Sequence, residues 1–151
     1  MKEEFQKLRE RYPESDAAFP NHLPKPNEND LNDIVAKYKC KFPPSFIAFQ
    51  LIYCHTTPIG DFAFDGFGWA NKMLDAYLNF EKVVKTFRRL DFPDYLTPFK
   101  QDNGDFWCFD NRSSEAEYPV IIWDHNSGDI ERELGYQWAN FLNWLTKTLE
   151  E

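Results

Sequence analysis

Two aspartates bracket an aromatic stretch at the start of the last third of the chain, and paired carboxylates often act together as general acid and base. The segment DNGDFWCFD places Asp105 before this stretch and Asp110 after it. Two carboxylates that share one proton or flank one scissile bond must lie close together. A strand rises roughly 3.3 Å per residue, so a strand over this segment would hold the two carboxylates more than about 10 Å apart. The pattern therefore favours turn-forming residues at the two ends of a strand.

Two other pairs combine a histidine with a group that it could activate or that could orient it. Cys54 and His55 could act as nucleophile and base, and Asp124 could hold the ring of His125 in one tautomer. Adjacent residues seldom present both side chains to one substrate, so a buried cysteine at a helix end is the favoured interpretation of the first pair. The second pair precedes the Asn-Ser-Gly sequence of residues 126–128, which favours a turn cap. Neither pair predicts an enzyme.

The chain also lacks the motifs that mark well-characterised catalytic sites. G-x-S-x-G, a Gly-rich phosphate loop and H-E-x-x-H are all absent from the sequence. A zinc site needs about four ligands with close pairs, and the histidines and cysteines of this chain form no such pairs. We therefore expect no catalytic residue, no metal and no cofactor. Three cysteines among apolar neighbours are expected to be reduced and buried: Cys40, Cys54 and Cys108.

Apolar periodicity predicts the helices that would position these residues. Spacings of three and four between apolar residues are typical of one buried helix face. For the second helix, Asn27 or Asn29 can serve as the N-cap. In the last helix the stripe begins at Trp138 and continues through Phe141 and Leu145. The predicted helices cover residues 2–12, about 30–39, 44–53, 81–90 and 137–148.

Three β-type runs predict a sheet. They cover residues 96–101, 105–110 and 119–124, and polar or Gly-containing turns separate them. Short connections make an antiparallel meander the economical arrangement. A further stretch, residues 59–69, has the glycines and alternation of short strands. The fold class is therefore α+β, a single domain in which an antiparallel sheet packs against several helices.

The side chains of the 105–110 strand should divide between two faces. With a period of two, Phe106 and Cys108 share one face, and Trp107 and Phe109 share the other. Burial of all four would mean that both faces of the strand are covered. Two tryptophans from other elements, Trp123 and Trp138, are expected in the core.

Length and apolar content indicate one folded domain over residues 1–151. Hydrophobic residues make up 42% and aromatic residues 18% of the 151 residues, which is enough for a substantial core. No run of 18 apolar residues and no apolar leader follows the first methionine, so neither membrane insertion nor export is predicted. The expected location is the cytoplasm.

The net charge of −8 comes from the last third of the chain. Residues 1–100 hold 14 Lys/Arg and 14 Asp/Glu, whereas residues 101–151 hold 3 and 11. An acidic surface repels phosphate backbones and attracts basic proteins, so we expect a protein partner and no nucleic acid. An acidic surface that only keeps the protein soluble is the alternative.

Three blocks of sequence resemble the SUKH superfamily, which has the Smi/Knr-type fold. KCKFPPSFIAF resembles its proline turn into a helix, and LTPFKQDNGDFWCFD resembles its Pro-Phe strand, Gly-Asp turn and aromatic-Cys-aromatic strand. YPVIIWDH resembles the returning strand. With the second and last helices, these blocks span residues 27–147, which would form the family core behind an N-terminal helix and Pro-rich loop over 1–26. Cys54, His55 and Thr56 replace the family's usual Asn-Gly-Gly, and Val35 stands about where an acidic residue is common.

This resemblance implies a binding function without catalysis. Bacterial members act as intracellular immunity proteins that neutralise a polymorphic toxin domain, often a nuclease, whereas a yeast member suggests a regulatory or scaffold module without a toxin. The acidic last third fits a cognate toxin domain that is basic. Its turn residues are the candidate contacts with that partner: Asp102, Asp105, Asp110, Glu115, Glu117, Asp124 and Asp129.

Overall fold

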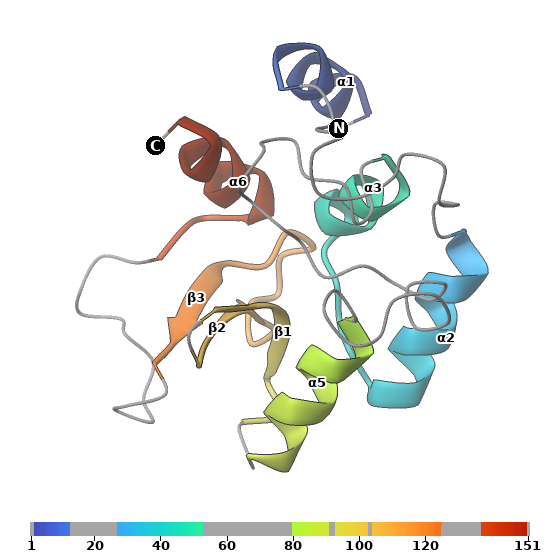
Figure 1. Cartoon of the computed structure of the whole chain (residues 1–151), viewed down its shortest axis with the longest axis vertical. Helices are drawn as coiled ribbons and strands as arrows, with labels where there is room; N and C mark the ends of the chain where they lie inside the picture. Colours follow the sequence, from blue (N-terminus) through green and yellow to red (C-terminus); the bar gives the residue numbers. More distant parts are fainter. Residues whose placement is uncertain are drawn as a thin grey trace.

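The protein combines helices with one small sheet. The computed structural model describes residues 2–12, 27–52, 80–90, 93–102, 104–124 and 137–150, and in these ranges it has five helices and a three-stranded sheet (Figure 1). The α+β class predicted from the sequence is confirmed. The helices are α1 (Lys2–Arg11), α2 (Glu28–Tyr38), α3 (Pro44–Ile52), α5 (Phe80–Arg89) and α6 (Phe141–Glu150), and the strands are β1 (Leu96–Asp102), β2 (Asp105–Asp110) and β3 (Val120–Trp123).

The strand β2 lies at the centre of the sheet and pairs antiparallel with both neighbours. Asp102 lies opposite Asp105 across the β1–β2 turn, where Gly104 has a φ of 95°. A residue with a side chain is disfavoured in this left-handed region, so glycine suits the turn. On the other side of β2, Phe106 lies opposite Trp123. The antiparallel arrangement predicted for the three β-type runs is confirmed, although β3 comprises only 4 residues.

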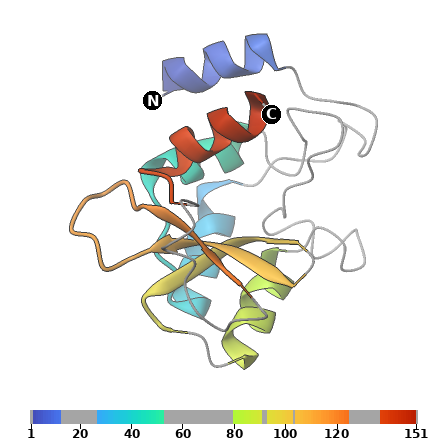
Figure 2. The same ribbon diagram turned by 90° about the vertical axis from the view of Figure 1, so that its left-hand side faces the viewer.

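Different parts of the chain cover the two faces of β2. Phe106 and Cys108 pack in one buried cluster with Phe87 of α5. Trp107 and Phe109 belong to a second, larger cluster that includes residues of α3 and α6. Figure 2 shows α5 on one side of the sheet and α6 on the other. The predicted alternation is confirmed, and three of the four side chains are buried while Trp107 is half-buried.

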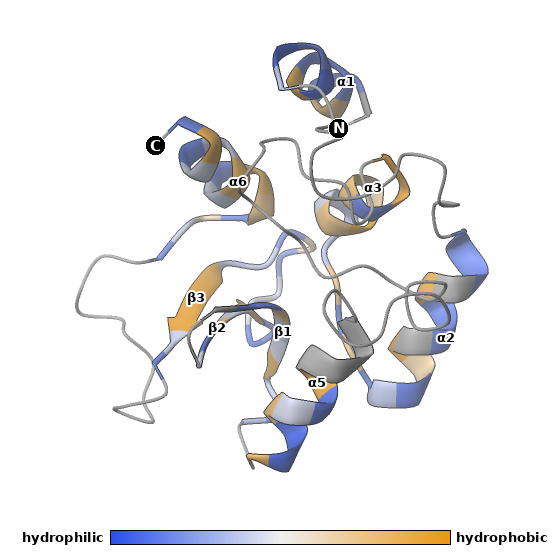
Figure 3. Ribbon diagram, viewed as in Figure 1, coloured by the Kyte–Doolittle hydropathy of each residue, from blue (hydrophilic) through white to orange (hydrophobic). Residues whose placement is uncertain are grey.

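Aromatic rings connect the sheet to α3 and α6. Phe99 of β1 stacks on Phe109 of β2, with ring centroids 4.5 Å apart. Phe46 of α3 packs edge-on to Phe109 at 5.2 Å, and Trp144 of α6 packs edge-on to Phe99 at 4.9 Å. Such pairs stabilise a fold by about 0.5–1.5 kcal/mol each beyond their buried area. Figure 3 shows that α3, which packs in this core, is mostly hydrophobic, whereas α1 is mostly hydrophilic.

Local signals set both ends of α2. The Oδ1 atom of Asn27 accepts a hydrogen bond from the backbone N–H of Asn29 at 2.8 Å, so Asn27 is the N-cap. The helix ends at Tyr38, and Lys39 follows with a φ of 53°. A left-handed residue directly after the last turn is a common way to terminate a helix. The predicted end near Lys39 is confirmed.

The start of the last helix was predicted wrongly. The helix begins at Phe141 rather than at residue 137, because Asn140 caps it: Asn140 Oδ1 accepts a hydrogen bond from the N–H of Asn143 at 2.8 Å. Trp138 instead forms an isolated antiparallel bridge with Val120, and its side chain is half-buried. Trp144 takes the core position, with 1% of its surface exposed. The expected burial of Trp123 is confirmed.

Several predictions fall outside the described residues. These are the loop from residue 13 to 26, the short strands over 59–69 and the side chains of Cys54, His55 and His125. Within the ranges that the structure describes, no helix is long and apolar enough to cross a membrane.

Candidate functional site

The register of the sheet divides the acidic candidates between its two ends. Asp102 and Asp105 lie opposite each other at one end, and Asp124 directly follows Trp123, the partner of Phe106 at the same end. The other acidic residues belong to the opposite end, where β2 finishes and residues 111–119 connect it to β3. The two groups are separated by the length of β2, roughly 3.3 Å per residue. The second group is Asp110, Glu115 and Glu117, and Asp129 lies outside the described residues.

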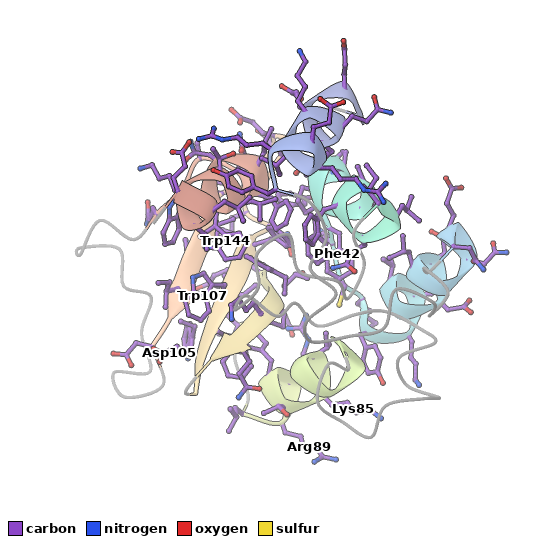
Figure 4. The ribbon with its side chains drawn as sticks, turned by 45° about the horizontal axis from the view of Figure 1, so that its top comes forward. Phe42, Lys85, Arg89, Asp105, Trp107 and Trp144 are labelled. Atoms are coloured by element: carbon purple, nitrogen blue, oxygen red, sulfur yellow. The ribbon has the colours of Figure 1, made fainter. Side chains whose placement is uncertain are left out.

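At the first end, Asp105 and Asp124 are both half-buried, and each interacts with other groups of the protein. Figure 4 shows Asp105 at the end of the sheet.

At the second end, Asp110 is neutralised by Arg112. Asp110 Oδ1 accepts hydrogen bonds from the backbone N–H of Arg112 at 3.1 Å and from its Nε at 2.9 Å, while Oδ2 accepts one from Nη2. The guanidinium also lies over the ring of Tyr95, with its Cζ 4.1 Å from the ring centroid. The hydrogen bonds that Arg112 donates to Asp110 raise the pKa of Arg112 above its ordinary value. This bidentate pair holds the loop in place and contributes little net charge.

Glu117 caps a helix that lies far away in the sequence. Its Oε1 accepts a hydrogen bond from the backbone N–H of Ser45 at 3.0 Å, and its Oε2 accepts one from the Ser45 hydroxyl. Ser45 is in the first turn of α3, where a carboxylate also interacts favourably with the positive end of the helix. Glu117 is half-buried, so it is not the freely exposed rim charge expected from the sequence.

A second set of hydrogen bonds fastens the same loop to the segment before α3. The Thr97 hydroxyl accepts a hydrogen bond from the N–H of Lys41 at 3.2 Å and donates one to Asn111 Oδ1 at 2.6 Å. Asn111 Nδ2 donates to the carbonyl of Lys41 at 3.2 Å, which closes the ring. Thr97 and Asn111 gave no signal in the sequence beyond a polar residue in a strand and a polar residue after one. Of the candidate acids whose side chains are described, Glu115 is the exposed one.

The two described cysteines are buried and free, as predicted, and are poor nucleophiles. Burial raises the pKa of the Cys40 thiol from 9.0 to about 11, and it raises the pKa of Cys108 as well. The positive charge of Arg88 opposes both shifts, with a smaller effect. Within the described ranges, no three histidine, cysteine or acidic side chains are grouped so as to hold a metal ion.

The raised pKa of Cys40 predicts a loss of stability in alkali. Its folded-state pKa of about 11 lies above the ordinary 9.0, so the stabilisation is present below the unfolded-state pKa and is lost as the pH rises through the folded-state value. The free energy of unfolding, measured between pH 8 and pH 11, should therefore fall less steeply in Cys40→Ala than in the parent protein. Equal slopes in the two proteins would contradict this assignment.

Comparisons with known proteins agree with this fold. The family model SUKH_5, described as SMI1-KNR4 cell-wall, matches residues 1–150. A crystal structure of a protein from Pseudomonas syringae pv. tomato is similar with a TM-score of 0.69 and 21% identity, covering 100% of both chains. At this identity the likeness shows a common fold. No curated protein matches the chain. The match confirms the resemblance seen in the three sequence blocks. Because the family model covers nearly the whole chain, the chain belongs to the SUKH_5 family.

Proposed function

We propose that this chain is a non-enzymatic intracellular immunity protein that neutralises a polymorphic toxin domain by direct binding. The observation that carries the proposal is the family match over residues 1–150, since SUKH members are known as immunity proteins to polymorphic toxins. The proposed location is the cytoplasm, where such a toxin would be met. The domain is proposed to consist of a family core over 27–147, with residues 1–26 as an N-terminal addition.

Charge supports a basic toxin, such as a nuclease with a cationic substrate groove. The chain has a net charge of −8, and its last third holds 11 acidic and 3 basic residues. An acidic protein can occupy a cationic groove and is attracted to it from a distance. The proposed contacts are the acidic residues at the two sheet ends, and among those whose side chains are described Glu115 is the exposed one. The same charge disfavours direct binding of nucleic acid.

A regulatory or scaffold module without a toxin partner is the second candidate. The family is described as SMI1-KNR4 cell-wall, and a role connected with the cell wall favours a regulatory or scaffold module. Both candidates are binding proteins without a reaction of their own, and the neighbouring genes separate them. An immunity protein should be encoded beside a large reading frame that ends in a small basic domain.

Co-expression tests the immunity function directly. Cells that express the neighbouring toxin domain alone should die, and cells that also express this chain should survive, with the two proteins purifying together in a stoichiometric complex. Rescue without a complex, or a complex without rescue, would overturn the proposal. A scaffold protein would give neither rescue nor a complex with the toxin.

Electrostatic attraction predicts a salt-dependent association rate. Neutralising one carboxylate at each end of the sheet, in Glu115→Gln with Asp124→Asn, should slow association at low salt and flatten its dependence on salt concentration. Replacing two exposed glutamates of α1, in Glu3→Gln with Glu10→Gln, is the matched control with the same change in net charge. Stopped-flow kinetics at low and high salt measures the effect. Equal slowing by the two double variants would show that net charge alone acts.

A further inference from the structure

A pocket lined by basic side chains lies between α2 and α5. It has a volume of about 480 Å³, and its lining among the described residues consists of Lys37, Tyr38, Lys39, Arg88 and Asp94. Figures 1 and 2 both show the C-terminal end of α2 close to α5. A volume of this size falls within the ~300–1,000 Å³ of small-molecule sites.

The charge of this pocket is opposite to that of the whole chain. Among the lining residues that the structure describes, three are cationic and one is a carboxylate, whereas the protein as a whole has a net charge of −8. The C-terminal ends of the two helices carry about half a negative charge each, which accounts for part of the attraction of cations to this place. After compensation of the two helix dipoles, the described part of the lining still has a net positive charge. An anion is therefore the class of ligand that the pocket favours.

Arg88 gives the most specific indication of a ligand. Its Nη1 atom is buried and donates no hydrogen bond to any residue that the structure describes, and its side chain is only 24% exposed. Its ion pair with Asp94 Oδ1 spans 3.7 Å, which is longer than a hydrogen bond, and the Asp94 side chain is fully exposed to solvent. A buried guanidinium donor without an acceptor is costly. A small rotation of the Arg88 side chain toward the pocket would let a bound oxyanion supply that acceptor.

We propose that this pocket binds a small molecule that carries a phosphate monoester. The planar fork of Arg88 fits two oxygens of such a group, and the ammonium group of Lys39 matches its second negative charge. The volume of about 480 Å³ leaves room for the group esterified to the phosphate. The proposal is independent of toxin binding, because it rests on a different part of the molecule from the acidic sheet ends.

Amide chemical shifts in the full-length protein would test this site, with glycerol phosphate as the probe. Saturable shifts are expected at residues 37–39 and 87–89, with tighter binding at pH 8 than at pH 5, since the second ionisation of a phosphate monoester has a pKa of about 6. Acetate should bind far more weakly, and inorganic phosphate more weakly than the ester. Equal binding of acetate would overturn the assignment of a dianion, and equal binding of inorganic phosphate would overturn the assignment of an ester.

Variants that each remove one positive charge distinguish specific binding in this pocket from non-specific electrostatic attraction of the ester to the protein. Arg88→Gln should weaken binding about tenfold or more, as expected for loss of a charge-assisted bidentate contact. Arg89→Gln is the matched control, because Arg89 is the next residue of the same helix and points away from the fold in Figure 4. Equal weakening by both variants would overturn the proposal.

A second variant covers the possibility that Arg88→Gln does not fold. Lys39→Asn removes another lining charge and suits the left-handed backbone at this position, where φ is 53°. It should fold and bind the ester several-fold more weakly than the parent. A folded Lys39→Asn protein with unchanged affinity would overturn the site.

Discussion

Replacing Trp144 by alanine is expected to lower the free energy of unfolding by about 3–5 kcal/mol, the usual cost of emptying a buried aromatic site. The indole packs edge-on to Phe99 and beside Phe141, and only 1% of Trp144 is exposed. The cavity would open where α6 meets the sheet. Denaturation in urea, followed by far-ultraviolet circular dichroism, measures the change.

Trp138→Ala is the matched control for this substitution. Trp138 is half-buried and its described bonds to Val120 are made by the backbone, so alanine keeps them. We expect a loss of about 1–2 kcal/mol, in proportion to the smaller buried area. If Trp138→Ala cost as much as Trp144→Ala, the side chain of Trp138 would be a full part of the core rather than half-buried.

Glu117→Ala should destabilise the protein by about 1.5–3 kcal/mol, although the residue is in a polar surface loop. The carboxylate accepts hydrogen bonds from both the N–H and the hydroxyl of Ser45, which is 3% exposed. Hydrogen bonds to charged groups contribute in this range, and the two donors would be left without their acceptor. The change is measured as a shift in the midpoint of chemical denaturation at constant slope.

Glu115→Ala provides the comparison, because Glu115 is two residues away in the same loop and is exposed. Its effect should stay within about 0.5 kcal/mol. Glu117→Gln, which keeps one oxygen acceptor, should fall between the two alanine variants. Equal stability of Glu115→Ala and Glu117→Ala would mean that the cap on α3 contributes nothing in solution.

Local patterns in the sequence were sufficient for the sheet and for most helices. The β1–β2 turn follows from Gly104, and the two faces of β2 follow from the strict alternation in the backbone of a strand. The start of α6 could not be predicted from these patterns, because Trp138 fits both a helical stripe and a short extended segment. Asn140 decides between these two conformations. Its side chain accepts a hydrogen bond from a backbone N–H of the first turn and so starts the helix at Phe141.

The features of the candidate sites depend on contacts that sequence patterns do not reveal. Glu117 and Ser45 are 72 residues apart, so nothing local indicates that a loop carboxylate caps α3. The sequence does not reveal the basic pocket, because its cations belong to a long stretch of chain whose charges cancel. Residues 1–100 are neutral as a whole, yet folding brings Lys37, Lys39 and Arg88 to one place.

The bridge between Val120 and Trp138 has a consequence for self-association. β3 pairs with β2 along one side, and on its other side the N–H and carbonyl of Val120 are both bonded to Trp138, at 2.9 Å and 3.0 Å. Exposed strand edges are the places where a second chain can add a strand and start aggregation. β3 has only 4 residues. At its first residue, Val120, the backbone N–H and carbonyl that face away from β2 already form hydrogen bonds with Trp138. The short stretch of chain ahead of α6 thus blocks the addition of a second chain at this position of the edge strand.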